Sequence, residues 1–432
     1  MSNRRVDLSV PILARVEGEG ALELVIENGA IGRLNLRIYE PPRFFEKFLE
    51  GRHVNEVPDL VARICGICPV AYQVSAVNAF ESLFGVEQTP WVVAMRRLLY
   101  CGEWIESHAL HVHMLALPDY FGYPSGIAMA KDYPEQIRRG LKLQGLGNEI
   151  MRLLGGRSVH PIGLKIGGFH HAPDTKAVDV LRAQLEAALP EAEAMLAWLA
   201  DVDVPKDQQR FTNVALRSDN YAVEQGVLYS SVGHKLLPHQ YPEHFSESHQ
   251  VYSTALWSHL DGESYLVGPL ARLNLYSQCG GGIAYIDHLL TLCRGRFPSQ
   301  TMFDSMLARA VEICFAIHES IEILGQYSRP ANVSQPFNIK AGECFGWSEA
   351  PRGLLWHQYQ VNEQGLITFA RLVPPTSQNQ ARIEEDLHQS LLAFGLDQPE
   401  EDIRLHCEKV IRNYDPCISC ATHFLSLKVE RK

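Results

Sequence analysis

Two pairs of cysteines lie near opposite ends of this 432-residue chain: Cys65-Gly66-Ile67-Cys68 and Cys417-Ile418-Ser419-Cys420. If the fold brings the pairs together, four thiols surround one point, and such a set of soft donors binds a metal ion. Pro69 predicts a helix that begins directly after the first pair. Asp415-Pro416 predict an N-cap and a first helical residue before the second. Thiols near helix N-termini ionise more easily than free ones.

The distance between the pairs along the chain bears on which metal they bind. A structural zinc site usually closes a short loop, whereas these pairs would close a loop of nearly the whole chain, which is costly for a purely structural clip. The spacing therefore favours a redox-active or catalytic metal. Structural zinc and four unrelated thiols are the alternatives that the residues leave open.

Composition excludes some classes of function. The formal net charge is -11 and the Lys and Arg residues form no basic stripe, which argues against a nucleic-acid partner. No apolar run reaches the roughly 18 to 20 residues of a membrane span, and no apolar secretory segment follows Met1, so we expect a soluble, cytoplasmic protein. The remaining cysteines stand singly and are expected to be buried thiols in a reducing compartment: Cys101, Cys279, Cys293, Cys314, Cys344 and Cys407.

The periodicity of the chain predicts a mostly helical α+β protein. Alternating residues at 21–26 and 32–38 flank Asn28-Gly29, which predicts an N-terminal hairpin, and a second hairpin is expected at 354–372. Helical spacing predicts helices at 44–49, 70–84, 91–117, 134–154, 174–202, 301–324, 379–394 and 399–412. Because the cysteine pairs lie at opposite termini, we expect one domain over residues 1–423, with a large helical bundle as its core.

Several segments together resemble the nickel-iron hydrogenase large subunit. The two that carry the cysteines, residues 63–69 and 415–423, are the most specific. Others follow in the family's order, and the resemblance covers residues 11 to 423: Arg15-Val16-Glu17-Gly18-Glu19-Gly20, Arg43-Phe44-Phe45-Glu46-Lys47, the stretch 156–168, Glu349-Ala350-Pro351-Arg352-Gly353 and Val373-Pro374-Pro375-Thr376-Ser377-Gln378-Asn379.

The resemblance implies a bimetallic site and its reaction. Cys65 and Cys417 would be terminal nickel ligands, and Cys68 and Cys420 would bridge nickel to an iron that carries carbon monoxide and cyanide. The implied reaction is the reversible oxidation of H2 to protons and electrons. Soft thiolates suit both metals.

The resemblance also implies roles for residues around the metals. Glu17 would be the carboxylate that takes a proton beside Cys417, although a glutamate is more often a surface residue. Arg352, with Pro351, would lie over the open metal position as a fixed cation. Asp119 and Asp415 would be acidic partners of Arg352; otherwise Asp119 is a turn residue and Asp415 an N-cap.

A second metal site is implied near the end of the chain. His423 resembles a magnesium ligand of the family, together with Glu46 and a backbone carbonyl near Arg371, although histidine is an unusual ligand for magnesium. We interpret most other histidines as hydrogen-bonded core or surface residues, including His108, His111 and His113.

Two positions depart from the family's pattern. Tyr72 stands where many members carry a histidine that hydrogen-bonds a cysteine sulfur, so a phenol would replace that donor. Pro375 stands where many members carry a hydroxyl that donates to a cyanide ligand. Thr376 or backbone groups would then take that role.

The resemblance implies partners as well. The chain has no further cysteine cluster spaced for iron-sulfur ligation, so an iron-sulfur small subunit would carry the electrons away. The motifs look most like the soluble bidirectional group, whose flavin-containing subunits react with NAD(P). Residues 424–432 would be an extension removed by a maturation protease after nickel-insertion factors have acted; an ordinary tail is the alternative.

Three other functions remain open at this stage. A hydrogen sensor would have the same four cysteines and slow turnover. A non-catalytic quinone-site subunit of the respiratory type would share the helical fold, although the presence of all four cysteines speaks against it. A protein that holds zinc alone is the third.

Overall fold

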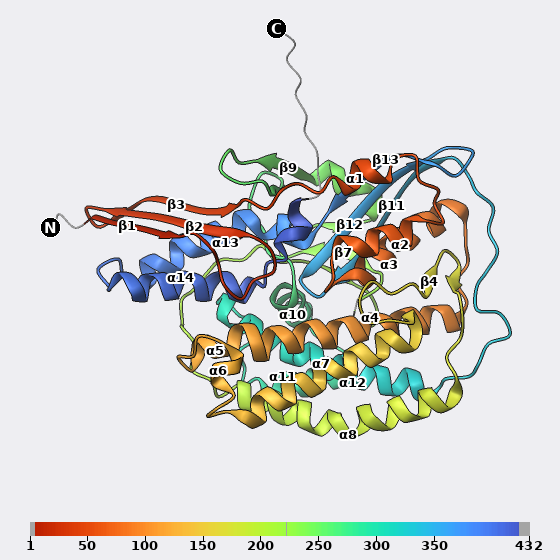
Figure 1. The fold of residues 1–432 in the computed structure, drawn as a ribbon, viewed down its shortest axis with the longest axis horizontal. Coiled ribbons are helices and arrows are strands. Elements are labelled where there is room, and N and C mark those ends of the chain that lie inside the picture. Colours follow the sequence, from red (N-terminus) through yellow and green to blue (C-terminus); the bar gives the residue numbers. More distant parts are fainter. Residues whose placement is uncertain (1–4, 222, 423–432) are drawn as a thin grey trace, which may run out of the picture.

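The computed structural model describes residues 5–221 and 223–422, and long helices form one side of the molecule while sheets and shorter helices form the other (Figure 1). The four longest helices are amphipathic or fully buried and pack on one another. α4 contacts α7 and α12, and α12 contacts α8. Their bounds are Pro90–Leu110 for α4, Pro134–Gly155 for α7, Thr175–Leu199 for α8 and Ser305–Gly325 for α12.

Two of the antiparallel three-stranded sheets, β1–β3 and β11–β13, lie on the side of the molecule away from α8 (Figure 1). In the N-terminal sheet, Asn28 and Gly29 both have positive φ, at 54° and 76°, and form the predicted turn. In the second sheet, the strand pair around residues 362–365 is also as predicted. The strands are β1 (Arg5–Val10), β2 (Gly20–Glu27), β3 (Ala30–Ile38), β11 (Gly342–Ala350), β12 (Gly353–Val361) and β13 (Ile367–Val373).

The other elements connect these layers. The helices are α1 (Phe45–Leu49), α2 (Val57–Val61), α3 (Pro69–Phe84), α5 (Leu117–Tyr120), α6 (Gly126–Met129), α9 (Tyr241–His244), α10 (Pro269–Gln278), α11 (Ala284–Leu292), α13 (Pro375–Phe394) and α14 (Glu400–Tyr414). The short strands are β4 (Leu164–Lys165), β5 (Gly168–Phe169), β6 (Val214–Arg217), β7 (Val227–Ser230), β8 (Lys235–Leu236), β9 (Phe245–His249) and β10 (Leu256–Leu260). Single turns are η1 (Ala62–Ile64), the π-helical η2 (His111–Ala116), η3 (Pro238–Gln240), η4 (Met302–Asp304) and η5 (Ile418–Thr422).

The predicted helices are present, and the differences have local causes. The helix predicted from 379 begins at Pro375, because Pro374 and Pro375 supply an extended N-cap and a proline at the first turn. The prediction for Asp415-Pro416 is wrong. Asp415 ends α14 in the left-handed conformation, with φ 55° and ψ 55°, and the following turn begins only at Ile418.

Burial separates a main core from a smaller one. The main core runs from Val6 in β1 to Ala421 near the end of the described chain. That residues 1–423 form one domain stays a prediction. The smaller core lies among β6 to β10 and the second sheet and includes Val214, Tyr241 and Trp356.

The single cysteines follow the prediction with one exception. Five of the six are buried, but Cys279 at the end of α10 is exposed, so the prediction is wrong for that residue. Among the described residues, no helix combines the length and the apolar character needed to span a membrane.

Close packing of α7 against α4 depends on Gly147. A Cβ at Gly147 would lie 2.5 Å from the backbone oxygen of Gly102 and 2.5 Å from the backbone nitrogen of Glu106, so the helices could not keep their separation. We expect Gly147→Ala to lower the free energy of unfolding by about 1–3 kcal/mol through overpacking.

Gly145 on the same helix is the matched control for this prediction. A Cβ there would meet nothing within 4 Å, so Gly145→Ala should be neutral or stabilise by about 0.5–1 kcal/mol. Thermal unfolding of both variants beside the wild type checks the pair of predictions. Equal unfolding temperatures for the two variants would contradict the packing argument.

Candidate metal centre

The fold brings the two cysteine pairs together in a thiol cluster formed by Cys65, Cys68, Cys417 and Cys420. The Sγ atoms of Cys65 and Cys417 lie 3.3 Å apart, those of Cys68 and Cys420 3.8 Å apart, and those of Cys417 and Cys420 3.0 Å apart. All four sulfurs lie within 4.8 Å of one another and all four residues are buried. None of the four forms a disulfide.

The first pair is held by the start of α3. Cys68 is the N-cap and Pro69 the first residue of the helix, as predicted. The Glu103 carboxylate, from α4, accepts hydrogen bonds from the backbone N–H groups of Val70 and Ala71 at 2.6 and 3.1 Å. Burial raises the pKa of Glu103 well above its ordinary value. Glu103 therefore caps the helix whose N-terminus carries Cys68.

Backbone hydrogen bonds hold the second pair against the N-terminal segment. Cys417 forms a parallel bridge with Glu17, and the backbone N–H of Ile418 donates to the Glu17 carbonyl at 3.0 Å. The backbone N–H of Cys417 donates to Thr376 Oγ1 at 2.9 Å. These bonds fix the register of a segment that has only one 3₁₀ turn of its own.

Arg43 connects the two pairs directly. Its Nη2 donates to the carbonyl of Ile64, which precedes Cys65, at 2.7 Å, and to the carbonyl of Ser419. Its backbone N–H donates to the carbonyl of Thr422 at 2.7 Å. One side chain thus joins the backbones of two segments that are far apart in sequence.

The four buried thiols differ in their pKa values. Hydrogen bonds from Cys417, Cys420 and Cys68 hold the pKa of Cys65 well below its ordinary value. Hydrogen bonding with Cys420 raises the pKa of Cys417 well above it. A bound divalent cation would stabilise all four thiolates at once. Four soft sulfur donors this close together therefore suit a thiolate-binding transition-metal centre such as nickel and iron.

Glu17 lies beside the thiol cluster. Its Oε2 is 3.2 Å from Cys417 Sγ and accepts the backbone N–H of Ser419 at 3.1 Å, and its Oε1 accepts the Ser419 hydroxyl. The side chain is only partly buried. Glu17 thus lies between the thiol cluster and the protein surface.

Arg352 lies on the turn that joins β11 to β12 and reaches the residue before the second pair. Its Nε donates to the Asp415 carbonyl at 2.7 Å and its Nη2 donates to Asp415 Oδ1 at 3.0 Å. Burial opposes its charge, but electrostatic interaction with Asp415 and then with Cys417, Cys68 and Cys65 outweighs burial and raises the pKa of Arg352 well above its usual value. Arg352 is therefore a permanent cation at the cluster.

The Nη1 donor of Arg352 is buried and has no hydrogen-bond partner in the described part of the chain. A buried unpaired donor is costly, so its retention beside the thiol cluster indicates a partner that is not a protein side chain.

The prediction that Asp119 pairs with Arg352 is wrong. Asp119 forms ion pairs with Arg15 and with Arg412, the latter at 2.6 Å between Nε and Oδ2. The cause is that the π-helical turn η2 and α5 carry Asp119 to the end of α14, where these two arginines lie. Asp119 holds the N-terminal segment against α14 and, through it, the start of the Glu17 segment.

The two positions that depart from the family's pattern lie beside the cluster. Tyr72 is fully buried; burial and then the charges of Cys420 and Cys68 raise the pKa of its phenol, so a neutral hydroxyl faces the sulfurs. Pro375 is the first residue of α13, and the neighbouring Thr376 hydroxyl is occupied as an acceptor by Cys417.

The predicted magnesium ligands are only partly within the described residues. Glu46 Oε1 accepts the backbone N–H of Leu372 at 2.8 Å, which places it beside Arg371 in β13. The Arg371 guanidinium binds Glu247 at 2.8 Å, so only its backbone is available for the predicted role. His423 lies outside the described residues, directly after Thr422.

The structure reveals acidic groups that the sequence did not single out. Glu106 on α4 is buried, and burial raises its pKa to about 7, while Arg352 lowers that pKa and Cys65 raises it. Its Oε2 has no hydrogen-bond partner among the described residues. Its position, one helical turn after Glu103 on α4, could have indicated that both face the same core.

The three histidines interpreted as hydrogen-bonded core or surface residues are all hydrogen-bonded and lie in the core. The Nε2 atoms of His108 and His111 bond Glu312 and the carbonyl of Arg412 at 2.9 and 2.7 Å. His113 Nε2 contacts Met195 Sδ at 3.0 Å. Burial lowers the pKa of all three, to about 4, 3 and 3.

A buried ion-pair network supports the turn that carries Arg352. Arg272 on α10 binds Glu312 and Glu349 at 2.7 and 2.8 Å and also donates to the carbonyls of Ala350 and Pro351. Arg272 therefore positions the β11–β12 turn.

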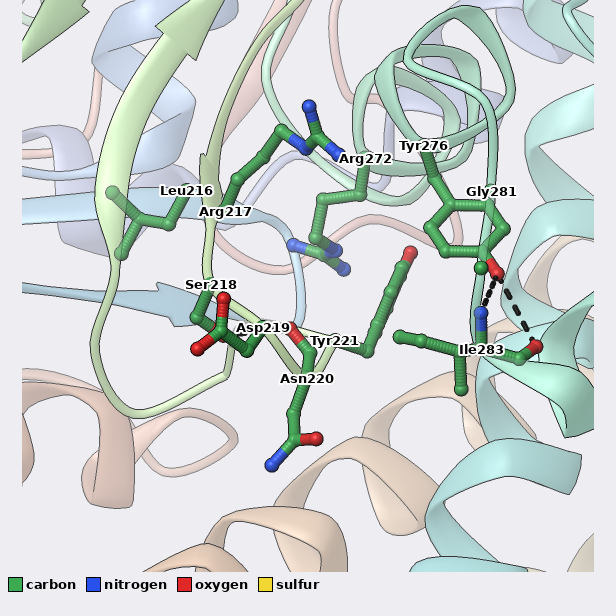
Figure 2. A pocket seen from close by; sticks show the side chains of 11 residues that line it. Leu216, Arg217, Ser218, Asp219, Asn220, Tyr221, Arg272, Tyr276, Gly281 and Ile283 are labelled. Atoms are coloured by element: carbon green, nitrogen blue, oxygen red, sulfur yellow. Dashed lines mark hydrogen bonds between the residues drawn. The ribbon is translucent and has the colours of Figure 1, made fainter.

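A separate cavity of about 240 Å³ opens beside this network. In Figure 2, Arg272 and Tyr221 point into it and Tyr276 bonds Ile283 at its wall. None of the four cysteines lines this cavity. It is therefore distinct from the thiol cluster, and its contact with the cluster is indirect, through Arg272 and the turn.

Comparisons with known proteins agree with this geometry. The family model described as nickel-dependent hydrogenase matches residues 43–136 and 219–423. The chain is 33% identical to sulfhydrogenase 1 subunit alpha of Pyrococcus furiosus over 439 residues, which covers 99% of this chain and 100% of that protein. It is 28% identical to NAD-reducing hydrogenase HoxS subunit beta of Cupriavidus necator, over 97% of this chain and 95% of that one.

Solved structures show the same fold. An NAD+-reducing NiFe-hydrogenase in the H2-reduced state superposes with a TM-score of 0.87 at 26% identity, covering 98% of this chain and all of that chain. A Ni-Fe-Se hydrogenase from D. vulgaris Hildenborough superposes with a TM-score of 0.81 at 20% identity. The thiol cluster, the fold around it and these matches lead to one conclusion: the chain belongs to the nickel-dependent hydrogenase family, as a large subunit.

Proposed function

We propose that the chain is the catalytic subunit of a hydrogenase that oxidises H2 reversibly and passes the electrons to an iron-sulfur subunit and on to NAD(P). The observation that carries this proposal is the buried cluster of four thiols with a fixed cation and a carboxylate beside it. When bound there, nickel and iron supply the centre at which H2 is cleaved into protons and electrons. Carbon monoxide and cyanide on the iron, and magnesium near Glu46, belong to the same proposal.

The protein's own part begins with the proton. Cys417 Sγ and Glu17 Oε2 are 3.2 Å apart, within reach for proton transfer. The Glu17 carboxylate accepts hydrogen bonds from three donors: Cys417 Sγ, the Ser419 backbone N–H and the Ser419 hydroxyl. Part of the Glu17 side chain is exposed at the protein surface. Glu17 would accept the proton from the sulfur and release it outward.

Arg352 supplies fixed positive charge where H2 would bind. Its guanidinium is held by Asp415 at two points, so no reorganisation is needed during the reaction. Its high pKa makes it a donor and an electrostatic group rather than a base.

The electrons require a partner. Within the described residues, the metal-ligand groups are the thiol cluster and one group of two histidines and an aspartate, so that part of the chain has no second set of cysteines for an iron-sulfur cluster. An iron-sulfur small subunit and flavin-containing NAD(P)-reactive subunits would complete the enzyme, as the name of the NAD-reducing relative suggests. A cytoplasmic location, maturation by nickel-insertion factors and a protease, and removal of residues 424–432 follow from the same proposal.

The test is hydrogen-dependent reduction of a viologen dye and of NAD+ and NADP+ by the purified complex. We expect rapid reduction together with nickel and iron in the protein. Slow turnover with both metals present would instead indicate a hydrogen sensor. Absence of nickel would indicate a non-catalytic subunit or a zinc protein.

Arg352→Lys tests the role of the cation. Lysine keeps one charge but cannot make both bonds to Asp415 or offer the planar Nη1 donor. We expect turnover to fall by about 10²-fold, as for loss of one fixed donor, with the metal content retained. Arg182→Lys, at an exposed pair with Glu186 on α8, is the control and should leave turnover unchanged. An unchanged rate in Arg352→Lys would remove Arg352 from the reaction.

A further inference from the structure

A second group of metal-ligating side chains lies on the surface, away from the thiol cluster. His234, His244 and Asp261 each direct a ligand atom to one point, and these atoms all lie within 4.8 Å of one another. His234 Nε2 is 2.8 Å from Asp261 Oδ2, and His244 Nδ1 is 3.2 Å from Asp261 Oδ1. None of the three takes part in the function proposed above.

The three residues come from separate turns. His234 lies in the turn between β7 and β8, His244 ends α9, and Asp261 follows β10. The backbone N–H of Asp261 donates to the carbonyl of His244 at 2.9 Å, which ties two of the turns together. The convergence of three loops at one point is a feature of sites built by the fold rather than by a single sequence motif.

A hydrogen bond with Ser230 fixes the orientation of the His234 ring. Its Nδ1 lies 2.9 Å from Ser230 Oγ, and its own backbone N–H donates to the same oxygen at 3.0 Å. Histidine ligands of metals commonly have their second ring nitrogen held by a hydrogen bond in this way, which leaves the other nitrogen directed at the metal. The imidazole is mostly buried, with its side chain 17% exposed, so the ring cannot turn freely.

Asp261 lies in a tight turn beside the two imidazoles. Asp261 and Gly262 have φ values of 49° and 90° and are the central residues of a two-residue hairpin. Its ends, Leu260 and Glu263, exchange backbone hydrogen bonds at 2.9 and 3.0 Å. Positive φ at both central residues is the ordinary conformation of such a turn, for which Asp-Gly is a preferred pair, so the turn by itself fixes where the Asp261 carboxylate lies.

The donor set indicates the ion. Two imidazole nitrogens and one carboxylate oxygen leave a fourth position for water, an arrangement that zinc adopts with ligand distances near 2.0–2.2 Å. Tetrahedral ligands at such distances lie about 3.3 Å apart. The His234–Asp261 and His244–Asp261 separations of 2.8 and 3.2 Å, each to a different Asp261 oxygen, are near that value. Calcium and magnesium prefer oxygen ligands and do not suit two imidazoles.

We propose that His234, His244 and Asp261 form a binding site for one Zn²⁺ ion, with His234 Nε2, His244 Nδ1 and an Asp261 oxygen as ligands. The ion would join the β6–β8 sheet to the β9–β10 sheet at the surface of the smaller core. Its role would be structural: it would hold together a segment of short strands that have few backbone bonds of their own.

The test compares zinc bound by the matured complex, in which the thiol cluster is already filled, with that bound by the double variant His234→Gln/His244→Gln. After dialysis against a chelator, the wild type should take up one more equivalent of Zn²⁺ per chain than the double variant. His239→Gln is the matched control, because His239 is an exposed histidine in the neighbouring turn η3 outside the group, and it should bind zinc as the wild type does.

Two further readouts keep the result interpretable. X-ray absorption at the zinc edge should show nitrogen and oxygen ligands and no sulfur, which separates this site from the thiol cluster. Hydrogen-dependent dye reduction by the double variant should equal that of the wild type, which shows that it is folded. Equal zinc uptake by wild type and double variant, or zinc bound only by sulfur, would overturn the proposal.

Discussion

Replacing Cys420 by serine is expected to abolish loading of both metals. Cys420 Sγ, in the second pair, lies 3.0 Å from Cys417 Sγ and 3.8 Å from Cys68 Sγ of the first pair, so its loss would remove a donor that both proposed metals would share. A serine hydroxyl is a hard donor that stays protonated near neutral pH and is a poor bridge between soft metals. Elemental analysis should find nickel and iron in the wild type and neither in the variant, with hydrogen-dependent activity below detection.

The control for this loss is Cys279→Ser. Cys279 is exposed at the end of α10 and lies outside the thiol cluster, so its replacement should leave metal content and activity unchanged. A Cys420→Ser protein with a full complement of nickel and iron would show that the cluster does not hold the metals.

Replacing Glu17 by glutamine should slow proton transfer while leaving the metals in place. Glutamine keeps the size of the side chain and one oxygen for the Ser419 bonds but cannot take up a proton near neutral pH. Loss of a general base costs about 10²- to 10⁴-fold in rate. Exchange of H2 with D2O and hydrogen-dependent dye reduction should both fall by that factor, with nickel and iron content unchanged.

Glu19→Gln, two residues further along the same segment, is the matched control. Glu19 is exposed, and its side chain makes no contact with the thiol cluster among the described residues, so its replacement should leave the exchange rate as in the wild type. If Glu17→Gln exchanged H2 at the wild-type rate, the proton would leave by another route, for which the buried Glu106 would be the first candidate.

Much of the site was predictable because its ligands have distinctive spacing. Local patterns can be recognised in a single sequence. Those of the site are the two cysteine pairs, the proline after Cys68 and the segments around Glu17 and Arg352. The structure places Glu17 beside Cys417 and Arg352 beside Asp415, as the resemblance implied. The long helices and both hairpins were predictable for the same reason, since their periodicity extends over many residues.

What could not be predicted depends on contacts between distant segments. The pairing of Asp119 with Arg15 and Arg412 is set by how α5 meets α14, and no local pattern encodes that meeting. Asp415 before Pro416 has the pattern of an N-cap, yet Asp415 ends α14 because Arg352 and the left-handed turn hold it there.

Supporting residues were missed for a related reason. Glu103 caps α3 from a different helix, and Arg43 joins the backbones of both cysteine segments, so each acts on residues remote in sequence. A buried charged residue in a helix such as α4 is a weak signal by itself. The role of such a residue can be inferred only when the element packed against it is known.

X-ray absorption at the nickel edge of the matured protein shows whether the four cysteines hold the metal, because it reports the atoms bound to nickel. We expect nickel in a sulfur-rich shell with iron close by, and loss of that signal in Cys420→Ser. Nickel bound only by nitrogen and oxygen, or zinc in place of nickel among the four sulfurs, would contradict it.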